Sequence, residues 1–263
     1  MEKFVKTEVR SGVGRITLCR AEKRNALKRD FIDQLNAAVE AFSIDDSLRV
    51  VVIQAEGTVF CAGMDLSEMQ ERAQSDSGKQ EWQKDSEVYA KLLSGIYHLK
   101  VPTIAVLQGP VLAGGVGMVL ACDFIVANAD SFIMLPEPAR GITAAMVTPL
   151  LVERVGIGAA THLLLSGERL AAADASRSGL IYDVVKSADL NDRVNLLITS
   201  IMAGSSSALA ITKEHLHRCG NERLDDQLAM SIQVSAEARE TDDAREGLAA
   251  FLEKRKPSWQ TEP

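Results

Sequence analysis

The sequence predicts an α/β protein with an all-helical C-terminal region. Strand-like and helix-like segments follow one another in the order β-β-α-β-α-β-α-β, which is typical of a sheet whose strands are joined by crossover helices. Two of the strand-like runs, "RVVVIQA" and "PTIAVLQG", are almost continuously apolar, as in strands buried on both faces. From about residue 190 onward the strand signals end, and apolar residues recur at helical spacing.

The first part of the chain supplies a hairpin, a helix and a strand. Two short strand-like runs, "FVKTEVR" and "RITLCR", flank a Gly-Val-Gly turn. A helix is predicted next, because apolar side chains recur on one face of the following stretch: Phe31, Leu35, Ala38, Val39 and Phe42. After the buried strand at residues 49–55, segment 67–100 is polar and ends in a helix-like stretch, "EWQKDSEVYAKLLSGIYHL".

The remaining segments complete the core and add the helical region. "PTIAVLQG" leads through a glycine-rich turn into a helix of small residues, "GGVGMVLACD", and the strands "DFIVANAD" and "SFIML" follow. We expect residues 1–190 to form the core that carries the site, and residues 191–263 to form helices. These helices carry more apolar surface than one core contact needs, which indicates either subunit packing or a cap on the same subunit. Their apolar faces comprise Val194, Leu197, Ile198, Ile201, Leu224, Leu228, Ile232 and Ala236.

Composition restricts the partners of the protein. Of its 263 residues 46% are apolar, and the net charge of −7 argues against a nucleic-acid surface or an anionic membrane surface. The N-terminal "MEKFVKTEVR" lacks the apolar core of a secretory signal, and the apolar region 101–127 is interrupted by prolines and Asp123. The four cysteines form no CxxC pair, and the histidines lack metal-ligand spacing. We therefore expect a cytoplasmic protein with free thiols and neither a membrane span nor a metal.

Two turns are candidates for carrying the chemistry. "FCAGMDL" follows one buried strand, and the glycine-rich turn follows the next. The second turn lacks the GxGxxG and GK[ST] patterns of nucleotide sites. Gly114 and Gly115 instead leave their amides unscreened at a helix start, where an N–H aimed at a developing oxyanion lowers a barrier by ~2.7–4 kcal/mol. The alternative is that these glycines serve only close packing of the helix against a strand.

Several motifs, in order along nearly the whole chain, resemble the crotonase (enoyl-CoA hydratase/isomerase) superfamily. They are "RNAL", "FCAGMDL", "PTIAVLQGPVLAGGVGMVLACD", "LPEPARGI" and "REGLAAFLEKRKPSW". The resemblance is nearest to the branch of methylglutaconyl-CoA and isohexenylglutaconyl-CoA hydratases. It implies a spiral of ββα units, and a helical C-terminal region that builds trimers or hexamers. It also implies an acyl-CoA thioester as substrate, with no separate cofactor.

The resemblance assigns the chemistry to three positions. The two oxyanion N–H donors fall on Met64 and Gly114, which would hold the thioester carbonyl and stabilise an enolate. Many hydratases of the family carry two glutamates; the first falls on Gly117 here and is absent, whereas the second falls on Glu137. The apolar neighbours of Glu137 in "MLPEPARGI" should raise its pKa toward the working range of an acid/base.

The resemblance also implies the binding residues. Arg24 falls where a basic residue contacts the CoA phosphates, and Ala26, Asp65 and Leu66 line the adenine region. In the tail, Phe251 and Lys254 resemble residues that reach the CoA of a neighbouring subunit, although Lys254 also fits a solvated "EKRK" run. The expected binding set is Arg24, Ala26, Ala62, Asp65, Leu66, Gly115, Gly117, Phe251 and Lys254.

A single glutamate leaves more than one reaction open. Glu137 could activate water for hydration, or move a proton from C2 to C4 as an isomerase does. "GGVG" resembles hydratases of branched glutaconyl-type CoA esters, so a lyase for a branched or bulky enoyl-CoA is favoured over a Δ3-Δ2 enoyl-CoA isomerase. A decarboxylase, a thioester hydrolase and an inactive binding protein are further alternatives. A dehalogenase is excluded, because Ala144 and Ala145 stand where its aspartate would be.

The neighbourhood of these residues gives further expectations. Gly117 would leave room for a larger acyl group, and segment 67–100 would cover the acyl pocket with Met69, Trp82, Tyr89 and Leu93. Cys61 has no nearby His–Asp partner in the sequence and is not expected to be a nucleophile. His215 and His217 do not share a helix face and are expected to be solvated, whereas Asp123 is expected to be a buried structural carboxylate.

Overall fold

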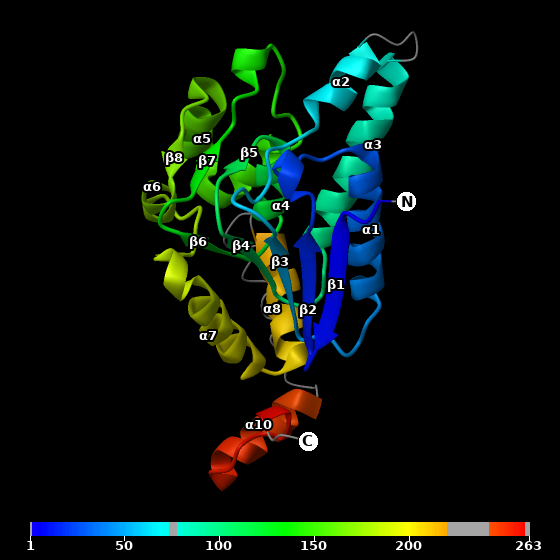
Figure 1. The fold of residues 1–263 in the computed structure, drawn as a ribbon. Coiled ribbons are helices and arrows are strands. Elements are labelled where there is room, and N and C mark those ends of the chain that lie inside the picture. The colour runs from blue at the N-terminus through cyan, green and yellow to red at the C-terminus, as the bar shows by residue number, and fades with distance from the viewer. Residues whose placement is uncertain (1, 74–77, 220–241, 261–263) are drawn as a thin grey trace.

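A mostly parallel sheet forms the centre of the computed structural model, which describes residues 2–73, 78–219 and 242–260 (Figure 1). Its strands lie in the order β1-β2-β3-β4-β6-β9. β1 and β2 form an antiparallel hairpin, and every later pairing in this sheet is parallel. The strands are Val5–Arg10 (β1), Val13–Leu18 (β2), Val50–Ala55 (β3), Thr103–Leu107 (β4), Phe124–Asn128 (β6) and Asp183–Val185 (β9). The predicted α/β core is confirmed.

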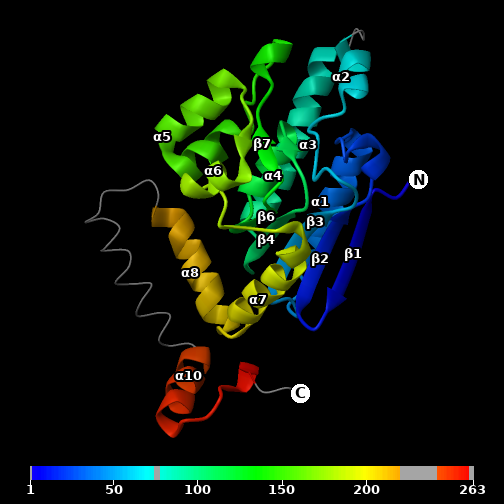
Figure 2. The same ribbon diagram turned by 60° about the vertical axis from the view of Figure 1, so that its left-hand side comes forward.

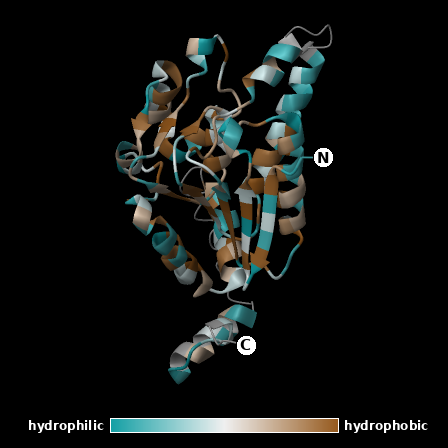
Figure 3. Cartoon of the chain, viewed as in Figure 1, coloured by the Kyte–Doolittle hydropathy of each residue, from teal (hydrophilic) through white to brown (hydrophobic). Residues whose placement is uncertain are grey.

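The central strands are buried on both faces, as their continuous apolar runs predict. Because successive side chains of a strand point to opposite faces, Val51 of β3 packs in one hydrophobic cluster and Val50 in another. The first cluster includes residues of α1 (Arg29–Ser43) and α3 (Gly78–Tyr97), and the second includes those of α7 (Leu190–Met202). Figure 3 shows hydrophobic residues gathered along these strands.

A small second sheet brings the two candidate turns together. It has the order β5-β7-β8, with β5 at Val111–Leu112, β7 at Phe132–Met134 and β8 at Leu170–Ala171. An isolated parallel bridge joins Cys61 to Val111, and α4 (Gly114–Leu120) begins two residues after β5. "FCAGMDL" and the glycine-rich turn therefore lie side by side, although they are far apart in the sequence.

The remaining helices of the core lie at the end of the sheet that carries these turns. α2 (Leu66–Ala73) and α3 lie side by side at the top of Figure 1, and α3 begins at Gly78, ahead of the helix expected from the sequence. α5 (Thr148–Ser166) breaks at Gly156, whose φ of 73° is non-helical, and α6 (Ala172–Arg177) follows β8. Gly156 adopts this left-handed conformation at little cost, because it has no Cβ atom.

The described part of the chain after β9 contains helices and no strand, as the sequence predicts. α8 (Ser206–Cys219) lies at the height of the central strands, and α10 (Asp242–Glu253) lies below it in both ribbon views (Figure 2). The predicted apolar positions Leu224, Leu228, Ile232 and Ala236 lie outside the described residues. Within the described ranges no single helix is long and apolar enough to cross a membrane; residues 187–202 and 206–219, bent by 102°, pass that test only as a pair.

Two hydrogen-bonded contacts attach α10 and its tail to the α7–α8 corner. The hydroxyl of Ser207 donates to the carboxylate of Asp243 at 2.8 Å, and Nε1 of Trp259 donates to the carbonyl of Ala203 at 3.0 Å. These contacts are all at the lower end of the molecule in Figure 1, so α10 lies at the end opposite to α2.

Candidate active site

The two candidate turns pack backbone against backbone. The amide of Leu112 donates to the carbonyl of Cys61 at 2.9 Å, which fixes their register. Gly63 has a φ of +88°, where a side chain would be strained. A Cβ atom at Gly63 would also lie 2.5 Å from Cβ of Ala113 and 3.2 Å from the nitrogen of Gly114. Glycine is therefore required at position 63, and its absence of a side chain lets the turns meet.

The amides of Met64 and Gly114 are unpaired donors at these turns. In the described part of the chain, neither N–H donates a hydrogen bond to a protein group. Ala113 precedes α4 with φ 50° and ψ −131°, and Gly114 is the first residue of the helix, where an N–H has no acceptor within the helix. Such a conformation in a non-glycine residue costs of order 1–3 kcal/mol, which is typical of functional turns.

Gly114 and Gly115 differ in whether packing requires a glycine. A Cβ atom at Gly115 would lie 2.7 Å from Cβ of Cys61, so Gly115 is required by close packing. A Cβ atom at Gly114 would meet only the side chain of Met64, at 3.5 Å, and the hydroxyl of Tyr89, at 3.7 Å, which are ordinary contacts. Packing therefore requires glycine at position 115 but does not require it at position 114.

Glu137 is a buried carboxylate with one unpartnered oxygen. It follows β7, whose Met134 carbonyl accepts a hydrogen bond from the Ala113 amide at 2.9 Å, so it lies beside the glycine-rich turn. Glu137 is only 5% exposed, and its Oε2 has no hydrogen-bond partner among the described residues. Burial raises its pKa, and this outweighs the opposing effects of its own backbone amide and of the Arg140 charge. An unpartnered carboxylate of raised pKa is suited to accept and return a proton.

The space beside Gly117 is filled by protein. A Cβ atom at this position would lie 2.5 Å from the hydroxyl of Tyr89 and 3.3 Å from both methyl groups of Leu93. The expectation that Gly117 leaves room for a larger acyl group is therefore wrong at this position, because α3 supplies the side chains that occupy it. Glycine at 117 is instead required so that α4 can approach α3.

A groove of about 590 Å³ collects most of the predicted CoA-binding residues of the core, although Gly115 and Gly117 do not line it. Four basic residues lie along it: Lys23, Arg24, Arg140 and Arg169. Lys23, Arg140 and Arg169 were not singled out from the sequence, where a lone basic residue is indistinguishable from a solvated one. The lining includes all of Arg24, Ala26, Ala62, Met64, Asp65 and Leu66.

An ion pair shapes the inner wall of this groove. Nη1 of Arg20 lies 2.7 Å from the carboxylate of Asp65 and also donates to the carbonyl of Ala26 at 2.7 Å. Both ionic side chains are mostly buried, at 11% and 15% exposure. Arg20 thus holds together two segments that the sequence placed at the adenine region, and sequence reasoning had missed it.

A second cavity, of about 260 Å³, adjoins the groove and shares Met64 and Asp65 with it. Met69, Trp82 and Tyr89 line it, as expected, whereas Leu93 packs against the Gly117 position instead. The other apolar lining residues are Leu27, Ile32, Ile142 and Met146. The mainly apolar lining suits an acyl chain.

The charged residues of this second cavity are compensated. The guanidinium of Arg29 pairs with Asp85, and its backbone amide donates to the carboxylate of Glu68 at 3.0 Å. Arg29 also lies 3.7 Å from a carboxylate oxygen of Glu81. This end of the cavity is therefore a closed ionic cluster that joins α1 to α2 and α3.

Comparison with known proteins decides the family. The model of the enoyl-CoA hydratase/isomerase family matches residues 8–262 of the chain. The chain belongs to this family. It is 34% identical over 251 residues to the 2,3-dehydroadipyl-CoA hydratase of Escherichia coli, which covers 93% of this chain and 94% of that protein. It is 32% identical over 248 residues to enoyl-CoA hydratase domain-containing protein 3, mitochondrial, of Xenopus laevis, covering 94% and 83%.

The solved structures agree with this assignment. An enoyl-CoA hydratase of Mycobacterium smegmatis superposes with a TM-score of 0.92 at 30% identity, over 99% of this chain and 100% of that chain. The crotonase-type fold and the enzyme class that the resemblance implied are thereby confirmed. As a member of the enoyl-CoA hydratase/isomerase family, the protein is an enzyme of enoyl-CoA thioesters.

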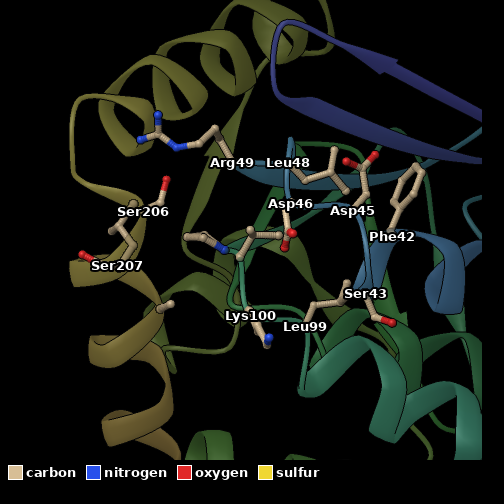
Figure 4. A pocket seen from close by; sticks show the side chains of 14 residues that line it. Phe42, Ser43, Asp45, Asp46, Leu48, Arg49, Leu99, Lys100, Ser206 and Ser207 are labelled. Carbon is tan, nitrogen blue, oxygen red and sulfur yellow. The ribbon is translucent and has the colours of Figure 1, made fainter. Parts of the chain in front are cut away.

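Some predicted residues of this hydratase/isomerase lie away from the site. Lys254 is exposed and follows α10, and Phe251 lies within α10, at the end of the molecule opposite to the groove (Figure 1). The side chain of Phe251 lies outside the described part of the structure. One chain therefore does not bring Lys254 to its own groove. A separate cavity of about 240 Å³ opens near this lower end, between Asp46 and Ser206, and shares no residue with the groove (Figure 4).

The remaining titratable candidates have structural roles. Burial raises the pKa of the Cys61 thiol to about 12, so it stays protonated and is not a nucleophile. Asp123 accepts hydrogen bonds from the Thr103 hydroxyl at 2.9 Å and from Nζ of Lys213 at 2.8 Å, as expected of a structural carboxylate. The prediction that His217 is solvated is wrong, because its ring stacks on that of Tyr97 with centroids 3.8 Å apart.

Proposed function

We propose that this enzyme is a hydratase that adds water across the double bond of an enoyl-CoA thioester. CoA would lie in the basic groove, the acyl chain in the adjoining apolar cavity, and the thioester at their junction beside Met64. The observation that carries the proposal is the buried carboxylate of Glu137, whose Oε2 has no partner among the described residues, near two turns in which the amides of Met64 and Gly114 are unpaired.

The chemistry uses one carboxylate and two amides. Glu137 takes a proton from water, whose oxygen forms a bond to C3 of the substrate. The electron pair of the C2–C3 double bond moves toward C1 and gives an enolate, whose oxygen accepts hydrogen bonds from the amides of Met64 and Gly114. Each such donor contributes ~2.7–4 kcal/mol to the stability of the charge. The protonated Glu137 then returns its proton to C2.

We further propose a branched or bulky acyl group. The "GGVG" sequence supports this substrate class, as does a cavity lined by Met64, Met69 and Met146, because flexible thioether side chains adapt to irregular shapes. The relative in Escherichia coli is named a 2,3-dehydroadipyl-CoA hydratase, and its acyl chain is unbranched. Δ3-Δ2 isomerisation uses the same carboxylate and amides and is the alternative reaction.

The helical region of residues 191–263 is proposed to build a trimer or a dimer of trimers. Lys254 follows α10, which lies at the end of the molecule opposite to α2, whereas Leu66 at the start of α2 lines the groove; this supports a role of Lys254 at the groove of a neighbouring subunit. Exposed apolar side chains on α5 (Val152, Ile157 and Leu165) support contact with such a neighbour. A cytoplasmic location stays a prediction, since the relative in Xenopus laevis is named as mitochondrial.

The test is turnover of purified protein, followed by loss of the enoyl absorbance. Crotonyl-CoA and a branched glutaconyl-CoA are compared, and the expected result is higher kcat/KM for the branched ester, with loss of activity in Glu137→Gln. Conversion of a 3-enoyl-CoA to its 2-enoyl isomer without hydration would favour the isomerase. Binding of CoA without turnover of either enoyl ester would favour an inactive binding protein and overturn the proposal.

A further inference from the structure

We infer that the ionic cluster at the end of the acyl cavity selects the substrate class: acyl chains that end in an apolar group are accepted, and chains that end in a carboxylate are rejected. The residues that decide this are Arg29 and Asp85. Because the acyl chain lies in this cavity only under the proposed function, the substrate class rests on that function. It concerns chains of six or more carbons, which extend past the C5 carboxylate of a glutaconyl ester.

Arg29 is the cation that a distal carboxylate would need. Among the described residues that line the acyl cavity it is the one basic residue, and the acidic ones are Asp65, Glu68 and Asp85. Asp65 is paired with Arg20. An incoming carboxylate would lose its water in this mainly apolar space, and only Arg29 in the described wall could return an ion pair.

Asp85 already occupies the guanidinium of Arg29. Nε of Arg29 donates to Oδ1 of Asp85 at 2.5 Å, and Nη2 pairs with the same oxygen. Nη2 also donates to the backbone carbonyl of Glu81 at 3.3 Å, and it lies 3.7 Å from the carboxylate of that residue. Two of the three guanidinium nitrogens are therefore engaged, and the positive charge of Arg29 is neutralised by the protein itself.

The helices that carry this cluster hold it at the cavity. Arg29 is the first residue of α1, and Glu81 and Asp85 lie one turn apart on the same side of α3. The backbone amide of Arg29 also donates to the carboxylate of Glu68, on α2, at 3.0 Å. The side chains of Arg29 and Asp85 are only 21% and 28% exposed, so water screens their charges in part. A substrate carboxylate beside Arg29 would thus be repelled by that of Asp85.

Nη1 of Arg29 supports the opposite interpretation. It makes no hydrogen bond to a protein group in the described part of the chain, so it could donate to a substrate carboxylate while Asp85 holds the other two nitrogens. However, a second carboxylate on the same guanidinium gains one attraction and meets one repulsion at a similar distance. Little is then left to offset its lost hydration, whereas an apolar chain end has no such cost. The charges therefore favour rejection.

The experiment measures binding, so it does not depend on turnover. Isothermal titration calorimetry gives the Kd of two pairs of saturated esters: hexanoyl-CoA with adipyl-CoA, and octanoyl-CoA with suberyl-CoA. The members of each pair have the same number of carbons and differ only in the end group. With the wild-type enzyme, the ester that ends in a carboxylate is expected to bind at least about tenfold more weakly.

Asp85→Asn keeps the shape of the side chain and removes its charge, so that Arg29 becomes available to the substrate. We expect this variant to shift the preference at least about tenfold toward the carboxylate esters. Glu81→Gln, which removes the more distant carboxylate, should shift it in the same direction by less. Asp183→Asn is the matched control. Asp183 pairs with Arg193 at 33% and 24% exposure and lines neither the groove nor the acyl cavity, so the preference should stay unchanged.

The outcomes are distinct. Equal or tighter binding of the carboxylate esters by the wild-type enzyme would overturn the inference and show that Arg29 receives the carboxylate. A preference that folded Asp85→Asn leaves unchanged would overturn it as well, as would an equal shift in Asp183→Asn. If circular dichroism shows that Asp85→Asn does not fold, an unchanged preference in Glu81→Gln has the same meaning. Hydration of crotonyl-CoA tests the proposed function separately, and its absence would remove the hydratase but not the binding preference.

Discussion

The unpaired amide of Gly114 can be removed by a proline substitution. Gly114 is the first residue of α4, and proline is well tolerated at the first position of a helix, where the amide has no partner in the helix. Because this N–H makes no hydrogen bond in the described chain, Gly114→Pro loses no folding interaction there. Ala113, at φ 50° and ψ −131°, lies outside the extended region that a residue before proline favours, so the folding of the variant is measured together with its reaction rate.

The size of that effect follows from the role proposed for the amide. One oxyanion donor is worth ~2.7–4 kcal/mol, so kcat for hydration should fall by about 10²–10³. Gly114→Ala is the matched control, since its Cβ atom would find only ordinary contacts at 3.5 Å and 3.7 Å, and it keeps the N–H. The assay is loss of enoyl absorbance with crotonyl-CoA, with far-UV circular dichroism and thermal unfolding recorded for both variants. A folded Gly114→Pro enzyme whose kcat lies within threefold of that of Gly114→Ala would refute the assignment of this amide.

The other residues of the site give further expectations. Glu137→Gln should lower kcat by ~10²–10⁴, and the wild-type rate should fall as pH drops through the raised pKa of Glu137; a pH-independent rate would contradict its role as a base. Because the folded protein holds the proton of Glu137 more tightly than the unfolded chain does, stability should fall as pH rises from the ordinary glutamate pKa to the raised one, and Glu137→Gln should remove that fall in denaturant titrations. Gly117→Ala should cost ~1–3 kcal/mol of stability by overpacking against the Tyr89 hydroxyl, and less in a Tyr89→Phe background; equal costs in both backgrounds would contradict the contact. Arg20→Ala should raise KM for enoyl-CoA several-fold at little cost in kcat, because the wall formed by Ala26 and Asp65 loosens; an unchanged KM would count against this groove as the CoA site.

The sequence was sufficient for the secondary structure of the core, because local patterns determine it. The apolar run of β3 and the alternating faces of α1 are properties of neighbouring residues, and both elements form where they were expected. The assignment of Met64 and Gly114 as the two proposed oxyanion donors came from the family resemblance. No local pattern indicates that two turns so far apart in the chain pack against each other.

Contacts between distant segments account for what the sequence could not show. Gly114 and Gly115 look alike in the sequence, yet only Gly115 is pressed against Cys61. The space at Gly117 looked open because its occupant, the hydroxyl of Tyr89, comes from a different helix. The stacking of His217 on Tyr97 likewise depends on how α8 packs, which the spacing of residues along one helix does not reveal.

Met64 borders both the groove and the acyl cavity, so its backbone amide and its side chain have different roles. In the proposed mechanism the amide donates to the thioester oxygen whichever side chain the residue carries, while the thioether would contact the part of the substrate that lies between the groove and the cavity. Replacing this side chain with a shorter or longer apolar one should therefore change the preference of the enzyme among acyl chains. The hydrogen bond from the backbone amide should stay intact. Selectivity and rate can be adjusted independently at a single position.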